Sequence, residues 1–171
     1  ALYCTCFSGI VFALVLHPRV VYGDTLCADA YQHVWQRCIR RSFSRELSMK
    51  IVIVGAGAMG SVYAAKFFEM DKECISLVAK GERYARLKAQ GLIVNDRHYT
   101  LPVLEVEEKT APSDLIIVAV KHHHLPGAIQ DMKNRIGDHT VILSVMNGIE
   151  SEEQIGAAYG MERVLYAVSV G

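Results

Sequence analysis

The chain has 171 residues, of which 51% are hydrophobic, and this is enough for one domain with a substantial core. It carries 18 basic and 18 acidic residues, so its formal net charge is zero. This balance argues against recruitment by nucleic acid or by an anionic membrane surface, and any recognition of phosphate must be local. The cysteines form no C-x-x-C pair and no dense pattern, which favours a reduced, cytoplasmic protein.

Residues 1–48 differ in character from the rest of the chain. Residues 2–16 are mainly apolar, but this run is short for a bilayer span and lacks the basic flank and the cleavage site of a secretory signal. The arginines and Trp35 within residues 31–45 are compatible with a basic helix that contacts a partner or a membrane surface. Because Met49 stands just before the first predicted strand, we instead interpret residues 1–48 as a leader of uncertain origin outside the domain.

Residues 49–171 alternate between strand and helix patterns. This alternation is typical of an α/β fold of the Rossmann type, a doubly wound, mostly parallel sheet with helices on both faces. Apolar, β-branched runs predict strands at 50–54, 74–79, 115–120, 140–145 and 164–170. Amphipathic runs, some of them ended by glycine, predict helices at 59–70, 82–90, 126–136 and 150–159. Residues 92–94 and 99–104 predict a hairpin or meander around Asn95-Asp96.

The first predicted strand ends in a G-x-G-x-x-G sequence that leads into a predicted helix. In this context the first glycine permits a tight turn, the second lets the backbone approach a diphosphate, and the third lets the helix pack against the strand. The helix start would then direct free N–H groups at the phosphates. A purely structural turn is the alternative. The predicted cofactor-binding residues of this turn are Gly55, Ala56, Gly57, Ala58, Met59 and Gly60.

The end of the second predicted strand is where such folds distinguish NAD from NADP. An acidic residue about 20 positions after the glycines would bind the ribose hydroxyls of NAD and repel a 2′-phosphate. Lys80 and Arg83 stand there instead, and their positive charges suit a phosphate group. Solvated loop cations are the alternative. The sequence therefore predicts NADP(H) as the cofactor and Lys80 as one of the residues that bind it.

Two later strands deliver polar residues to their carboxyl ends, where open α/β sheets bind ligands. Lys121 follows residues 115–120 and is placed either to hold a carboxylate or a cofactor hydroxyl, or as an ordinary surface lysine. Asn147 is either a ligand or a turn former in an Asn-Gly pair. The adjacent histidines 122–124 point in different directions and have no carboxylate or cysteine at ligand spacing, so no metal site is predicted.

Together these residues resemble those of one known family. The glycine turn, Lys80, Lys121 and Asn147 occur in the order and spacing found in the amino-terminal domain of the ketopantoate reductase (2-dehydropantoate 2-reductase) family, over residues 49–171. The resemblance implies reduction of 2-dehydropantoate to (R)-pantoate with NADPH, on the way to pantothenate and coenzyme A. It also implies that Lys121 and Asn147 contact both nicotinamide and substrate. Lys80 stands where many relatives carry arginine, which keeps the charge but loses the planar fork.

One feature of the family has no counterpart in this sequence. The family's general acid is a lysine of a helical carboxyl-terminal domain, which we interpret as absent here, so no catalytic residue is predicted within the chain. Hydride transfer to a ketone needs a proton donor and an enclosed site. We therefore expect the chain alone to bind NADP(H) without turning over its substrate.

The expected partner is a small 2-keto acid, with no nucleic acid and no membrane, and the oligomeric state stays open. Two alternatives remain. One is a different NADP-dependent 2-keto acid reductase or hydroxyacid dehydrogenase, since one fold supports many chemistries. The other is a dinucleotide-binding domain without catalytic activity, which would act through a partner.

Overall fold

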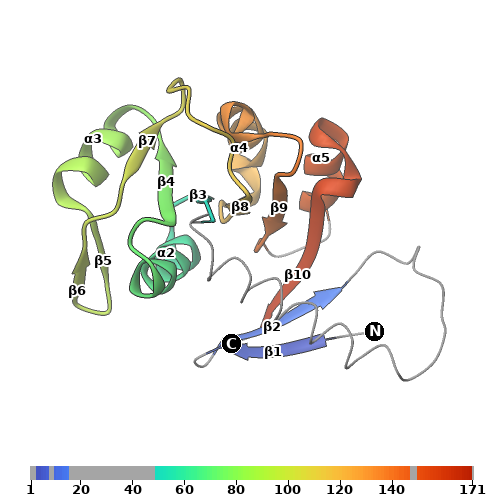
Figure 1. The fold of residues 1–171 in the computed structure, drawn as a ribbon, viewed down its shortest axis with the longest axis horizontal. Coiled ribbons are helices and arrows are strands. Elements are labelled where there is room, and N and C mark those ends of the chain that lie inside the picture. The colour runs from blue at the N-terminus through green and yellow to red at the C-terminus, as the bar shows by residue number, and fades with distance from the viewer. Residues whose placement is uncertain (1–2, 8–9, 16–48, 147–149, 171) are drawn as a thin grey trace.

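A parallel sheet lies at the centre of the computed structural model, which describes residues 3–7, 10–15, 49–146 and 150–170. Its parallel strands are, in spatial order, β7 (Val103–Glu105), β4 (Ile75–Ala79), β3 (Ile51–Val54), β8 (Leu115–Val118), β9 (Val141–Ser144) and β10 (Val164–Val170). Counted along the chain, this is the order 3-2-1-4-5-6 of doubly wound dinucleotide-binding folds. The predicted Rossmann-type α/β fold is confirmed, and the strand order reverses between β3 and β8 (Figure 1).

Helices cover both faces of this sheet. The described α-helices are α2 (Ala58–Met70), α3 (Gly81–Gln90), α4 (Leu125–Asp131) and α5 (Glu150–Tyr159). Ile51 and Ile53 belong to a buried cluster with side chains of α2 and α3. Val52 and Val54 belong to a second cluster with side chains of α4 and α5. Because successive strand residues point to opposite faces, β3 contributes to both cores, which explains its uninterrupted Ile and Val composition.

Residues 126–136 do not form the single helix that their pattern predicts. α4 ends at Asp131, and a tighter 3-10 turn, η2 (Lys133–Arg135), follows. The Arg135 side chain is fully buried and donates hydrogen bonds to the carbonyl oxygens of Glu105 and Glu108 at 2.7 and 2.5 Å. The turn tightens where these bonds tie the end of the helical segment to the β7–β8 connection.

The hairpin after α3 differs from its prediction in the second strand. β5 (Leu92–Val94) pairs with β6 (Arg97–Tyr99), whereas the predicted partner was 99–104. Asn95 and Asp96 have φ values of 46° and 60°, so a two-residue turn of the kind that suits tight hairpins fixes the register. The remaining apolar residues form β7 and join the main sheet in parallel beside β4.

Two amino-terminal strands extend the sheet in the antiparallel direction. β1 (Tyr3–Phe7) pairs with β2 (Ile10–Val15), and β2 pairs with the later part of β10, from Tyr166 to Val170. β9 pairs with the start of β10 only, at Val164 and Leu165. The assignment of residues 1–48 to a leader outside the domain stays a prediction. None of the helices in the described ranges is both long and apolar enough to cross a membrane.

Deletion of residues 1–48 tests this boundary. We expect the shortened chain to unfold cooperatively, with a Tm within about 4 °C of the parent, equivalent to roughly 1 kcal/mol in a chain of this size. The reason is that the described members of both buried clusters, which enclose β3 on its two faces, lie after Met49. Thermal unfolding followed by circular dichroism measures this. A longer deletion that also removes β3 is the control and should abolish the transition. Loss of cooperative unfolding on deletion of residues 1–48 alone would make β1 and β2 part of the domain.

Candidate dinucleotide-binding site

The turn from β3 into α2 packs too closely for side chains at two of its glycines. Gly55 has a φ of +104°, and a Cβ there would lie 2.6 Å from the carbonyl oxygen of Ala119, just beyond β8. A Cβ on Gly60 would lie 1.9 Å from the carbonyl oxygen of Gly55. Both distances are shorter than real Cβ contacts, so these two glycines are required by the packing of β3, α2 and β8.

Gly57 is different, because the protein itself does not fill the space beside it. A Cβ on Gly57 would meet only the Ala119 carbonyl oxygen, at 3.9 Å, and its φ of −85° and ψ of −166° suit other residues. Gly57 is the N-cap of α2, with no side-chain capping bond and no acidic residue in the first turn. The N–H groups and the positive dipole end of the helix are therefore available to an anion, and this cradle fits a diphosphate.

A cavity of about 910 Å³ opens beside Gly57, at the carboxyl ends of β3, β4, β8 and β9. It lies at the point where the strand order reverses, which is where doubly wound folds bind dinucleotides. Its volume suits a ligand of that size. Of the predicted site residues, those that line it are Gly55, Gly57, Ala58, Met59, Lys80 and Lys121. Of the other two in the glycine turn, Gly60 packs against backbone and Ala56 packs against the buried cluster around β3.

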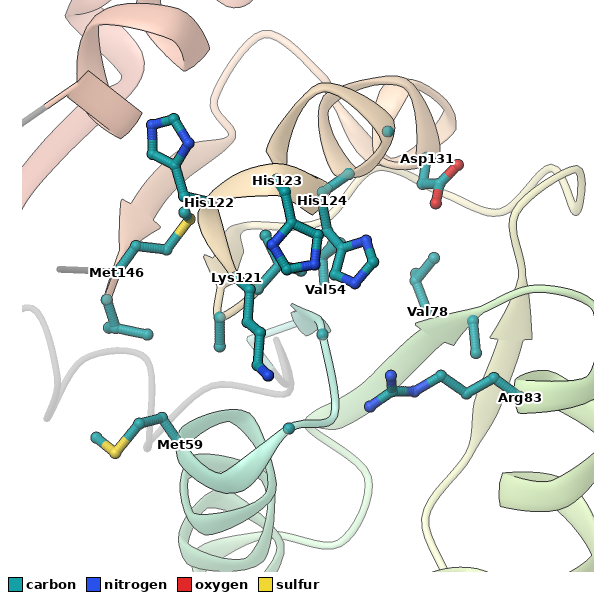
Figure 2. A pocket seen from close by; sticks show the side chains of 18 of the residues that line it. Val54, Met59, Val78, Arg83, Lys121, His122, His123, His124, Asp131 and Met146 are labelled. Carbon is teal, nitrogen blue, oxygen red and sulfur yellow. The ribbon is translucent and has the colours of Figure 1, made fainter. Parts of the chain in front are cut away.

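Lys121 reaches into the middle of this cavity. It is the N-cap residue of a short 3-10 turn, η1 (His122–His124), that connects β8 to α4, and its side chain points toward the start of α2 (Figure 2). The residue is exposed, and none of the ion pairs within the described ranges involves it. Its charge is therefore directed at the cavity and suits an anionic ligand.

The end of β4 carries both predicted cations into the cavity wall. The Arg83 guanidinium donates a hydrogen bond to the carbonyl oxygen of Ala56 at 2.6 Å, which ties α3 to the glycine turn. Lys80 Nζ lies 2.7 Å from Oδ1 of Asp131, at the end of α4. A carboxylate thus lies beside the end of β4, where the sequence pattern has a lysine in place of the acidic residue of NAD-binding folds. Asp131 lies 51 positions later, so no local pattern pointed to it.

The histidines of η1 lie at the rim of the cavity. His122 Nε2 lies 2.9 Å from Oε2 of Glu150 at the start of α5, and the His123 and His124 rings contact each other at a tilt of 50°, with centroids 4.1 Å apart. In the part of the chain that the structure describes, His, Cys, Asp and Glu side chains gather in no group of three that could hold a metal ion.

Asn147, the second predicted ligand of substrate and cofactor, lies outside the described residues, so its role stays a prediction. Its neighbour Met146 lines the cavity. At the end of β9, the Ser144 hydroxyl lies 2.8 Å from the Ser151 hydroxyl of α5, and Ser151 donates to the buried Glu152 carboxylate at 2.6 Å. These bonds connect the end of β9 to the start of α5.

Cys74 does not contribute to the site. Its thiol donates to the carbonyl oxygen of Asp71 at 3.1 Å at the opposite end of β4 from Lys80, and burial raises the pKa of Cys74 to about 11. The thiol therefore stays protonated at neutral pH and is a poor nucleophile.

Comparison with known proteins agrees with this geometry. Residues 51–171 match the family model described as ketopantoate reductase PanE/ApbA. A 2-dehydropantoate 2-reductase of Streptococcus pyogenes is 30% identical over 125 residues, which cover 71% of this chain and 41% of that protein.

Solved structures give the same picture. The ternary structure of D-mandelate dehydrogenase with NADH and anilino(oxo)acetate superimposes with a TM-score of 0.61 and 32% identity, over 68% of this chain and 39% of that one. A 2-dehydropantoate 2-reductase of Geobacter metallireducens gives a TM-score of 0.57 and 27% identity, over 68% and 40%. The chain thus spans about two fifths of the length of the relatives it matches. The neighbours support a nicotinamide dinucleotide as the ligand of the cavity.

Substitution of two glycines by alanine separates binding from folding. Gly57→Ala should leave the Tm nearly unchanged and weaken NADPH binding at least about tenfold, because the methyl group enters the space left for the diphosphate. Gly60→Ala should lower the free energy of unfolding by roughly 1 to 3 kcal/mol or more, because its Cβ meets backbone. Thermal unfolding and fluorescence titration with NADPH measure both effects. Equal NADPH affinity of Gly57→Ala and the parent would show that the diphosphate does not lie at this turn.

Proposed function

The chain belongs to the ketopantoate reductase family, and from this premise we propose that it is the cofactor-binding part of an NADPH-dependent 2-dehydropantoate 2-reductase. The proposed reaction converts 2-dehydropantoate to (R)-pantoate in the synthesis of pantothenate and coenzyme A. The observation that carries the proposal is the cavity at the strand-order reversal, which joins an unfilled space at Gly57 to the cation of Lys121. The first suits a dinucleotide diphosphate, and the second suits the carboxylate of a 2-keto acid.

In this proposal different parts of the cavity have different tasks. Lys80 and Arg83 attract the 2′-phosphate at one end, and α2 holds the diphosphate through its first N–H groups. Lys121 extends into the middle of the cavity, between Arg83 on one side and Met59 and Met146 on the other, and holds the substrate carboxylate there (Figure 2). Asn147 joins the cofactor to the substrate through hydrogen bonds.

Bound NADPH would supply the hydride that the keto carbon receives. The chain's own contribution is to orient the two reactants, because a positioned pair reacts far faster than a pair that meets by diffusion. The proton donor is expected among the residues that the longer relatives have in addition. We therefore expect cofactor binding without turnover from these 171 residues alone.

A second candidate is a related 2-keto acid reductase that acts on a different side chain. The observation that favours it is the likeness to D-mandelate dehydrogenase, whose structure holds NADH and anilino(oxo)acetate. The carboxylate of Asp131 beside Lys80 also favours this candidate, since an acidic group at the ribose end suits NADH.

Cofactor preference is the first test. One charged contact contributes about 1.5 to 3 kcal/mol, so NADPH should bind roughly tenfold or more tightly than NADH. Lys80→Ala should reduce this preference, whereas Lys133→Ala, a change of an exposed lysine outside the cavity wall, should not. Fluorescence titration with each dinucleotide measures the two affinities. Equal affinity of the parent chain for both would contradict the NADP assignment.

Lys121→Ala and Asn147→Ala test the proposed substrate contacts, in a full-length protein that contains this chain. Loss of an orienting cation or hydrogen bond should reduce kcat/KM by about one to two orders of magnitude, while the Tm stays nearly constant. Steady-state rates with 2-dehydropantoate and unfolding curves give the two quantities. Full activity of both variants, or a fall in Tm large enough to explain the loss, would refute the proposed roles. Activity only with other 2-keto acids would favour the second candidate.

A further inference from the structure

The ion pair between Lys80 and Asp131 spans the adenosine end of the cavity. Its atoms are 2.7 Å apart, and both residues line the cavity wall. The Lys80 side chain is 59% exposed and the Asp131 side chain 19% exposed. The lysine is thus the more solvent-exposed partner, and the carboxylate is partly enclosed.

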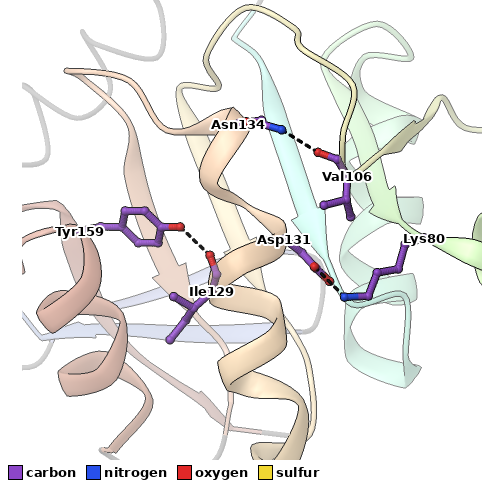
Figure 3. A network of polar contacts seen from close by, with 6 residues as sticks. All are labelled: Lys80, Val106, Ile129, Asp131, Asn134 and Tyr159. Carbon is purple, nitrogen blue, oxygen red and sulfur yellow. Dashed lines mark hydrogen bonds and ion pairs between the residues drawn. The ribbon is translucent and has the colours of Figure 1, made fainter.

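Asp131 is held in place by its helix. Tyr159 Oη of α5 donates to the carbonyl oxygen of Ile129 at 2.5 Å, and Asn134 Nδ2 donates to the carbonyl oxygen of Val106 at 2.9 Å (Figure 3). Beside Asp131, Met132 is fully buried. The helix end therefore cannot shift the carboxylate away from the cavity without breaking these contacts. A ligand that binds Lys80 must therefore compete with an anion whose backbone is anchored.

We propose that Asp131 sets the dinucleotide selectivity of this chain by competing with the 2′-phosphate for Lys80. The inference rests on the proposed function and deepens it. A 2′-phosphate bound to Lys80 would lie close to the Asp131 carboxylate, and like charges at such a distance repel each other. The carboxylate can instead accept a hydrogen bond from a ribose 2′-hydroxyl, the task of the acidic residue in NAD-binding relatives of the fold.

The charges at this end of the cavity set the direction of the effect. Lys80, Arg83 and Asp131 together carry a net charge of about +1, and neutralisation of Asp131 would raise it to about +2. NADPH carries an additional dianionic phosphate here, whereas NADH carries a neutral hydroxyl. Removal of the carboxylate charge should therefore strengthen NADPH binding and leave NADH binding unchanged or weaker. With Asp131 in place, the preference for NADPH over NADH is therefore smaller than Lys80 and Arg83 alone would give.

Asp131→Asn is the test, since it removes the charge and keeps the size of the side chain. The matched control is Asp138→Asn, which changes an exposed aspartate outside the cavity wall. Isothermal titration of the 171-residue chain gives the Kd values of NADPH and NADH, and thermal unfolding shows that each variant is folded. If Asp131→Asn does not unfold cooperatively, Asp131→Ser replaces it.

We expect Asp131→Asn to raise the ratio of the NADH Kd to the NADPH Kd about tenfold, and Asp138→Asn to leave it unchanged. In a Lys80→Met background the same substitution should change the ratio less than about threefold, because the contested cation is gone. The proposed competition would be overturned if Asp131→Asn left the ratio of the two Kd values unchanged, or if it raised that ratio fully in the Lys80→Met background. In either case, measurable binding of a dinucleotide would leave the proposed function intact. Absence of binding of either dinucleotide to the parent chain would overturn both.

Discussion

The backbone contact between the glycine turn and the end of β8 is the constraint on which the rest of the structure depends. Gly60 lies against the carbonyl group of Gly55, and Gly55 lies against that of Ala119. This contact brings the start of α2 and the end of β8 together at the strand-order reversal. It fixes where the helix dipole points and where Lys121 emerges. The cavity is the space that remains above this junction of two glycines with the end of β8.

α4 has a second organising role, because it belongs to the core and to the cavity wall at once. Leu125 and Ile129 fill the core, whereas Asp131 and Gly127 line the cavity. Arg135 then ties the following turn to the β7–β8 connection through the carbonyl oxygens of residues 105 and 108. Burial of a guanidinium is costly unless its donors are paired, and here both terminal nitrogens of Arg135 donate hydrogen bonds that hold the segment. The position of Asp131 relative to β4 follows from this anchorage.

The sequence was sufficient for features that depend on short-range patterns. The helix at 150–159 and the strand at 164–170 have the predicted bounds, since Gly160, with a φ of +97°, marks the end of the helix. The glycine turn could also be predicted, because its three glycines lie within six consecutive residues. The hairpin register could not, because it depends on Asn95 and Asp96 both taking positive φ. The proximity of Asp131 to Lys80 is a tertiary contact over 51 positions, and no periodicity encodes it.

The separation between the core and the residues that we propose set cofactor selectivity has a consequence for how such a domain evolves. Neither buried cluster includes Lys80, Arg83 or Asp131, so these side chains lie outside the apolar core of the sheet. Surface substitutions away from packed features usually change stability by only about half a kcal/mol. Under the proposed competition, single replacements at the rim would shift the preference between the two nicotinamide dinucleotides without a poorly folded intermediate. The junction at Gly55 and Gly60 has no such freedom.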